Sequence, residues 1–250
     1  MTTKVYPVSN FQEYYPSQNP YNFKIREFGD KDGICQLLAD ELTEKHKGRW
    51  RERFGKPASA HLDLELGAYH GETTNHLGKT NPGSVCLGVE WKYKMCFMGG
   101  KKARDQGITN VTHLRANIAR LPWMFEKGEI DRVWVLFPDP WSKRLGQHKW
   151  RLLQPGFFRM LACMLPEGKE LMIKTDHQEY SQFIANSVAE AGCFDKMSDE
   201  KAAANWALIP PTPFERIFIR QKLPIYPIAL VRNAKVVEPP AEVKDVLSGN

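Results

Sequence analysis

Short apolar runs alternate with longer segments of mixed polarity through the middle of the chain. We expect buried strands at residues 61–66, 85–90, 111–114, 131–137 and 170–174. We expect helices at residues 91–106, 154–165 and 180–191. Strands that alternate with helices indicate a doubly wound parallel sheet.

Two late apolar segments, around Phe218 and at 225–231, are expected to pair as a terminal antiparallel hairpin. The expected fold is therefore α/β: a Rossmann-like, doubly wound, mostly parallel seven-stranded sheet. It would have an antiparallel C-terminal strand and helices on both faces.

The two ends of the chain show less periodicity. Residues 1–30 are rich in Tyr, Asn, Gln and Pro and predict an irregular arm, whereas residues 32–53 predict a helix with a basic end. Residues 233–250 are polar and predict a disordered tail. One domain over 31–232 is the expected organisation.

Composition narrows the class of protein. A chain of 250 residues with 42% apolar content suits one sizeable domain, and its net charge of +6 favours a polyanionic partner over a merely basic surface only slightly. The five cysteines form no CxxC pair, which indicates reduced thiols in a cytoplasmic protein and no metal site. We expect no membrane association, because no apolar run or leader suggests one.

The first predicted strand ends in a glycine turn. Glu65 is followed by Gly67 and Gly71, and glycine lets a ligand approach the backbone closely. The G-x-x-x-G spacing suits S-adenosylmethionine better than a dinucleotide, which favours G-x-G-x-x-G. A tight structural turn is the alternative interpretation.

Polar residues end the next two strands. Glu90 ends the second strand, where an acid can accept hydrogen bonds from ribose hydroxyls, and a surface glutamate is the alternative. Asn117 follows the third strand and is a candidate to face an adenine ring.

The fourth strand runs into the segment FPDPWSK, residues 137–143. Asp139 stands between two prolines, each of which restricts the backbone, so its carboxylate is held stiffly at the ligand-binding edge of the sheet. An acid, an aromatic ring and a lysine together suit a nucleobase in an anionic chain.

These features resemble the tRNA (guanine-N(7)-)-methyltransferase family over residues 55–232. The matching segments, in order, are FPDPWSK, HKWRLLQP at 148–155, Lys174-Thr175-Asp176 and Thr212-Pro213-Phe214-Glu215. The resemblance implies a class I S-adenosylmethionine-dependent enzyme that forms 7-methylguanosine in tRNA, at position 46 of the variable loop.

Residue roles follow from the same resemblance. It implies a cofactor site lined by Glu65, Glu90, Asn117 and Asp139, with Asp139 nearest the chemistry as the catalytic residue. It implies guanosine binding by Lys143, Asp176, Thr212 and Glu215.

The chain also departs from the family's pattern. Tyr69 replaces the middle glycine of the first turn, where a side chain would crowd the cofactor or demand a negative φ. Asn117 replaces an aspartate, Leu145-Gly146 is an apparent insertion, and Trp150 stands where arginine is usual.

The implied chemistry needs no strong base, because N7 of guanine carries an exposed lone pair. Asp139 and Asp176 are candidates to stabilise the charge that develops on the purine, and Trp141 to stack on it. Phosphate contacts are expected from Lys143, Arg144, Lys149 and Arg151.

Two other functions stay open. One is a methyltransferase for another nucleobase position, such as an exocyclic amine. The other is a non-catalytic RNA-binding relative. Monomer and homodimer are equally open, and a dehydrogenase is disfavoured by the glycine spacing.

Overall fold

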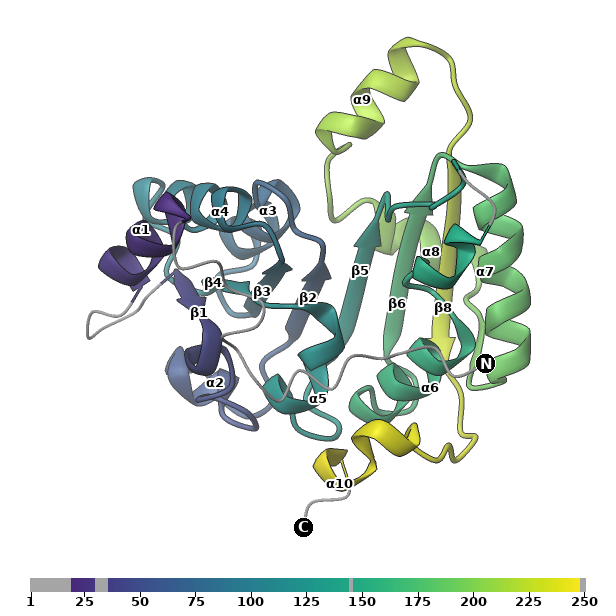
Figure 1. The fold of residues 1–250 in the computed structure, drawn as a ribbon, viewed down its shortest axis with the longest axis horizontal. Coiled ribbons are helices and arrows are strands. Elements are labelled where there is room, and N and C mark those ends of the chain that lie inside the picture. Colours follow the sequence, from purple (N-terminus) through teal and green to yellow (C-terminus); the bar gives the residue numbers. More distant parts are fainter. Residues whose placement is uncertain (1–18, 30–35, 144–145, 248–250) are drawn as a thin grey trace.

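The computed structural model describes residues 19–29, 36–143 and 146–247. Within them one sheet is formed by β1 (Leu37–Ala39), β2 (Leu62–Leu66), β3 (Val85–Glu90), β4 (Val111–Arg115), β5 (Arg132–Leu136), β6 (Glu170–Thr175), β7 (Phe194–Lys196) and β8 (Tyr226–Arg232). Their spatial order is β1-β4-β3-β2-β5-β6-β8-β7 (Figure 1). The strands from β1 to β6 pair in parallel, and β8 pairs antiparallel with both β6 and β7.

The strand order creates a switch point between β2 and β5. From β2 the chain builds outward through β3 and β4, whereas β5 and β6 build in the opposite direction. Leu66 of β2 lies in register with Val135 of β5, so the segments after both strands emerge at one edge of the sheet. Ligands bind at such an edge in open α/β sheets.

Helices surround the sheet. The α-helices are α1 (Pro20–Gly29), α2 (Trp50–Arg53), α3 (Glu72–Thr80), α4 (Tyr93–Asp105), α5 (Leu121–Met124), α6 (Pro155–Met164), α7 (Gln178–Ala191), α8 (Asp199–Trp206), α9 (Pro213–Arg220) and α10 (Lys244–Leu247). Short 3₁₀ turns are η2 (Asp40–Thr43), η3 (Ile118–Arg120), η4 (Gln147–Trp150) and η5 (Ala241–Val243). The helices predicted at 91–106, 154–165 and 180–191 are confirmed as α4, α6 and α7.

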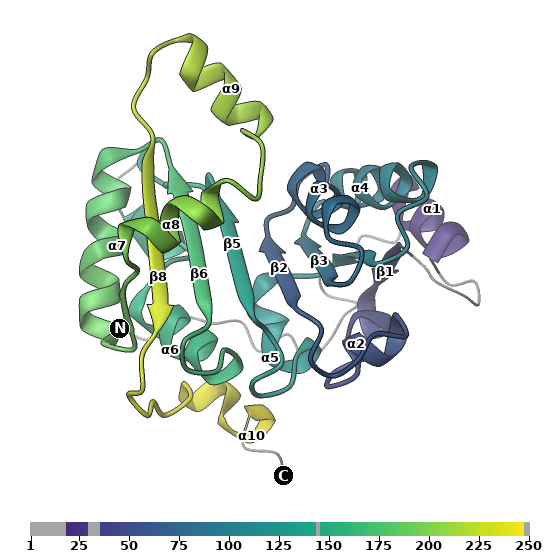
Figure 2. The ribbon, with the colours of Figure 1, turned by 180° about the vertical axis from the view of Figure 1, so that it is seen from behind.

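Alternate residues of the central strands pack into two separate hydrophobic cores, one on each face of the sheet. Val133 and Val135 of β5 belong to a large cluster that includes residues of α6 and α7, whereas Trp134 between them belongs to a second cluster beside α8. Figure 2 shows α8 crossing the face of the sheet that is hidden in Figure 1. Burial on both faces explains why the strands read as continuous apolar runs.

The expected C-terminal hairpin is wrong, and the sheet has eight strands instead of seven. Phe218 lies in α9, where Thr212 and Glu215 begin a helix with a capping box, so this segment does not pair with β8. The additional strands, β1 and β7, are three residues each and extend the two edges of the sheet. Strands this short give too little periodicity to be predicted.

The expected helix over 32–53 is also wrong in the residues described. Leu37, Leu38 and Ala39 are all buried and pair with β4, because three consecutive buried residues fit an edge strand better than the stripe of a helix. After β1, the described residues of this range form the 3₁₀ turn Asp40–Thr43 and the single α-helical turn Trp50–Arg53, whose Trp50 indole donates to the Met124 carbonyl at 2.8 Å.

Most of the irregular arm predicted over 1–30 lies outside the described residues, but residues 20–29 and part of the predicted tail are ordered. Residues 20–29 form α1, whose Ile25 is fully buried and whose Tyr21 ring lies 5.7 Å from that of Phe97. In the predicted tail, Val243 and Leu247 bury their side chains in the main core. One helical turn separates them, so a short apolar face suffices to order this segment. The domain boundaries themselves stay a prediction.

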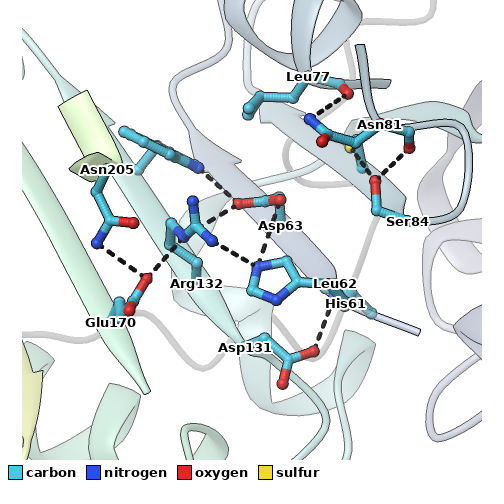
Figure 3. A network of polar contacts seen from close by, with 12 residues as sticks. His61, Leu62, Asp63, Leu77, Asn81, Ser84, Asp131, Arg132, Glu170 and Asn205 are labelled. Carbon is cyan, nitrogen blue, oxygen red and sulfur yellow. Dashed lines mark hydrogen bonds and ion pairs between the residues drawn. The ribbon is translucent and has the colours of Figure 1, made fainter. Parts of the chain in front are cut away.

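A polar network joins β2, β5 and β6 near their amino-terminal ends, whereas the ligand-binding edge lies at their carboxyl ends (Figure 3). Asp63 accepts from the Trp134 indole at 2.8 Å, and Arg132 lies 2.9 Å from Glu170, which also accepts from Asn205. Arg132 also lies 3.7 Å from Asp63, and these ion pairs join the strands, although Nε and Nη1 of Arg132 have no hydrogen-bond partner among the described residues. In the part of the chain that the structure describes, no helix has the length and apolarity needed to span a membrane.

Candidate functional site

A cavity of about 490 Å³ opens at the switch point. Its walls come from the turn after β2, the ends of β3 and β4, the loop after β5 and the start of α9. The lining includes Glu65, Gly67, Tyr69, His70, Glu72, Glu90, Trp91, Asn117, Phe137, Asp139, Trp141, Trp150, Thr212 and Phe214. Of the residues predicted to bind a cofactor, Glu65, Gly67, Glu90, Asn117 and Asp139 line this cavity, whereas Gly71 does not.

The glycine turn needs glycine at two positions for different reasons. Gly67 has φ +80°, and a Cβ atom there would meet nothing within 4 Å, so the open side of the turn faces the cavity. Gly71 has φ +70°, and a Cβ atom would lie 2.3 Å from Cε1 of the buried His113. Gly67 leaves room for a ligand, whereas Gly71 leaves room for the protein's own core.

Tyr69 adopts the conformation that glycine would favour. Its φ is +46°, so the expectation that a side chain there demands a negative φ is wrong. The Tyr69 N–H donates to the Glu90 carboxylate at 2.9 Å, and its ring contacts those of His70 and Phe214 at centroid distances of 4.0 and 5.7 Å. These contacts offset the strain of about 1–3 kcal/mol that such a backbone carries.

Glu90 and Asn117 are held by backbone amides on the cavity wall. Glu90 is 8% exposed and also accepts from the Lys92 N–H at 2.7 Å. The side-chain oxygen Oδ1 of Asn117 accepts from the Ala119 N–H at 2.9 Å and caps η3. Because both side chains are fixed, they present preset polar groups to whatever enters.

Glu65 is an unusual acid because it is buried beside the cavity. It accepts from the N–H of Thr74 at 2.9 Å and from the Thr74 hydroxyl. Burial nonetheless dominates these bonds and raises the pKa of Glu65 to about 7.

This pKa predicts a pH-dependent stability. Between the unfolded value of 4.5 and about 7, the folded protein holds a proton that the unfolded chain releases. The stabilisation from neutral Glu65 is therefore full below pH 4.5 and lost as pH rises through about 7, an effect of about 3 kcal/mol. Urea unfolding at pH 5 and 8 should show this loss in the wild type but not in Glu65→Gln. A Glu65→Gln variant with the same pH profile as wild type would contradict the assignment.

The loop after β5 has an unusual backbone conformation that neighbouring residues support. Phe137 and Trp141 have φ of +53° and +47°, one on each side of Pro138-Asp139-Pro140. The Phe137 N–H donates to the Lys174 carbonyl at 2.8 Å, and its ring stacks on Phe218 at 5.8 Å. Asp139 itself is exposed and lines the cavity. Strained backbone around an available carboxylate is typical of functional loops.

Arg151 supports this loop, so its expected phosphate contact is wrong. Arg151 is 3% exposed, donates from Nε to the Pro140 carbonyl at 2.7 Å and pairs with Glu179 at 2.9 Å. Lys143 and Lys149 are exposed, as a phosphate contact requires, whereas Arg144 lies outside the described residues. Lys143 does not line the cavity.

The T-x-x-E segment has a clear structural task. The Glu215 N–H donates to the Thr212 hydroxyl at 3.1 Å, the Thr212 N–H donates to Glu215 at 3.3 Å, and Glu215 pairs with Lys174 at 2.6 Å. Thr212 lines the cavity, but Glu215 and Asp176 do not. Guanosine binding by these residues stays a prediction.

We expect Glu215→Ala to destabilise the fold by about 3–5 kcal/mol, because it leaves the largely buried Lys174 ammonium unpaired. The double variant Lys174→Met/Glu215→Ala should regain part of this loss in a urea titration. If both variants unfold at the same urea concentration as wild type, the ion pair does not hold α9.

Sequence reasoning missed several aromatic residues of the cavity. Trp91, His70 and Phe214 line it, although none had been proposed for a role. Phe214 lies inside the T-x-x-E segment, a pattern that specifies only the two polar residues on either side of the ring. His113, which supports the glycine turn from below, had no sequence signal beyond its place in a strand.

Comparisons with known proteins identify the family of this chain. A family model described as "Putative methyltransferase" matches residues 59–228. The tRNA (guanine-N(7)-)-methyltransferase of Parasynechococcus marenigrum is 31% identical over 191 residues, which are 73% of this chain and 80% of that protein. The enzyme of the same name from Christiangramia forsetii is 30% identical over 62% of this chain and 71% of its own.

Two further matches differ in length or in sequence. A bifunctional glycosyltransferase/methyltransferase of Fusobacterium nucleatum is 26% identical over 83% of this chain, which spans only 32% of that protein. Among solved structures, the 16S rRNA methyltransferase KamB superposes with a TM-score of 0.51 at 16% identity, over 74% of this chain and 93% of its own. That likeness shows a shared class I methyltransferase fold and no more.

Proposed function

Because the chain belongs to the tRNA (guanine-N(7)-)-methyltransferase family, we propose that it transfers a methyl group from S-adenosylmethionine to N7 of a guanine in tRNA. The observation that carries this proposal is the shared cavity, in which the glycine turn after β2 and Asp139 after β5 line the same space. Position 46, a cytoplasmic location and the choice between monomer and homodimer stay predictions.

The residues present fit the proposed cofactor. A volume of about 490 Å³ suits a small ligand, since such sites measure about 300–1,000 Å³. Gly67 leaves the backbone open on the cavity side, and the fixed carboxylate of Glu90 can accept hydrogen bonds from ribose hydroxyls. Asn117 offers its amide to an adenine ring. When bound, S-adenosylmethionine supplies an electrophilic methyl group on a sulfonium.

The chain's own contribution is positioning and charge. N7 of guanine attacks through a free lone pair, so no side chain has to remove a proton first. The purine becomes positively charged as the bond forms, and the stiffly held Asp139 carboxylate can stabilise that charge. An ionised carboxylate only accepts hydrogen bonds, so it also favours the N–H groups on the Watson–Crick edge of guanine.

Nucleoside analysis tests the proposal. Unmodified tRNA transcripts would be incubated with the protein and methyl-labelled S-adenosylmethionine, digested, and examined by mass spectrometry. We expect the label in 7-methylguanosine. Label in an exocyclic-amine product would favour the alternative methyltransferase, and no label together with no heat of cofactor binding in calorimetry would favour the non-catalytic relative.

A further inference from the structure

Two tryptophans stand half in solvent at the mouth of the cavity. Trp141 is 40% exposed and Trp150 is 49% exposed, and both line the cavity. Neither indole forms a ring pair with another aromatic side chain within residues 19–29, 36–143 and 146–247. Large aromatic rings kept accessible at a cavity mouth indicate a surface that binds something flat.

One buried arginine joins the backbone segments that carry the two tryptophans. Arg151 follows Trp150 in sequence, and its Nε donates at 2.7 Å to the carbonyl of Pro140, the residue before Trp141. The guanidinium is buried over the Tyr180 ring at 5.0 Å and paired with Glu179. The segments that carry the two indoles are thus joined before any ligand arrives, which lowers the ordering cost of binding.

Positively charged side chains near the two tryptophans favour RNA over the cofactor as their ligand. The Lys149 ammonium lies 5.3 Å from the centroid of the Trp150 ring, and Lys149 and Lys143 are exposed. The acids Glu65 and Glu90 line the cavity from β2 and β3, not from the loop that carries the tryptophans. An aromatic ring beside lysines is the combination that binds unpaired bases of a nucleic acid strand, with the lysines near the phosphates.

We propose that Trp150 stacks on an unpaired RNA base adjacent to the target guanine. The inference rests on the proposed function and deepens it: the enzyme takes its guanine from a splayed, single-stranded segment, because a base inside a duplex has no free face for an indole. Trp150 is then a positioning residue for RNA and has no part in cofactor binding.

Fluorescence anisotropy with a short labelled single-stranded RNA containing one guanosine tests this without any turnover. We expect Trp150→Ala to weaken binding about tenfold and Trp150→Phe to restore most of it. The exposed Phe23 of α1 (64% exposed) offers a matched control, and Phe23→Ala should bind like wild type. Because the indole is half exposed, Trp150→Ala should keep the wild-type melting temperature.

RNAs that lack the base on one side of the guanosine complete the test. With one of the two abasic RNAs, wild type and Trp150→Ala should bind equally. The proposal is overturned if Trp150→Ala binds intact RNA like wild type, if its defect is equal on all three RNAs, or if it weakens S-adenosylmethionine binding instead. Absence of 7-methylguanosine in the nucleoside analysis would contradict the proposed function, but the RNA-binding measurements would still test the stacking by Trp150.

Discussion

Replacing Asp139 with alanine is expected to lower methyl transfer to tRNA by about 100- to 1,000-fold, the loss typical when one preset electrostatic group is removed. The side chain is exposed at the cavity, so no core packing is lost and the melting temperature should stay unchanged. Single-turnover transfer of labelled methyl, with the cofactor saturating, measures the chemical step.

Two variants sharpen this result. Asp139→Asn keeps the size of the side chain and removes its charge, so it should be nearly as slow as Asp139→Ala if charge is what matters. Glu72→Gln alters another acid of the same cavity that has no place in the proposed chemistry, and it should change the rate by a few-fold at most. Near-normal turnover by Asp139→Ala would remove this residue from the mechanism.

A large loss of stability, about 2–5 kcal/mol, is also expected from Gly71→Ala. It combines a left-handed backbone with a methyl group 2.3 Å from His113 Cε1. The imidazole cannot move aside, because it is fully buried with Nε2 2.8 Å from Asn75 Oδ1. Urea unfolding gives the loss directly.

Gly67→Ala is the matched control for the turn. It has the same left-handed backbone but open space around the new methyl group, so it should lose only about 1–2 kcal/mol of stability. Its methyl group projects toward the cavity, so its defect should instead appear in the calorimetric affinity for S-adenosylmethionine. Equal stability losses for the two variants would mean that the contact with His113 is not restrictive.

The central strands could be predicted because each is buried on both faces and therefore appears as an unbroken apolar run, as in Val85–Glu90. The strands at the edges of the sheet could not be predicted. Leu37–Ala39 is too short for a period to emerge, and it is a strand only because β4 lies beside it. Phe218 looked like part of a strand because a strongly amphipathic helix and a short strand share apolar residues at close spacing.

The candidate site shows a similar division. Glu65, Gly67, Glu90 and Asp139 could be placed from sequence because they lie at or just beyond the carboxyl ends of parallel strands, which share one edge of the sheet. Arg151 could not, since whether an arginine faces phosphate or the protein interior depends on the Pro140 carbonyl and Glu179, which come near it only in the fold. The sequence of a basic loop does not distinguish buried arginines and lysines from exposed ones.

The most direct test of the central claim uses a tRNA that cannot be methylated at N7. Once the modified guanosine is mapped, a ligated transcript would carry 7-deazaguanosine at that position, which replaces N7 with carbon and keeps the Watson–Crick edge. Incubated with labelled S-adenosylmethionine, this tRNA should bind like the unmodified transcript and acquire no label. Transfer of label to the deaza nucleotide would show that the methyl group goes to a different atom and would contradict the account.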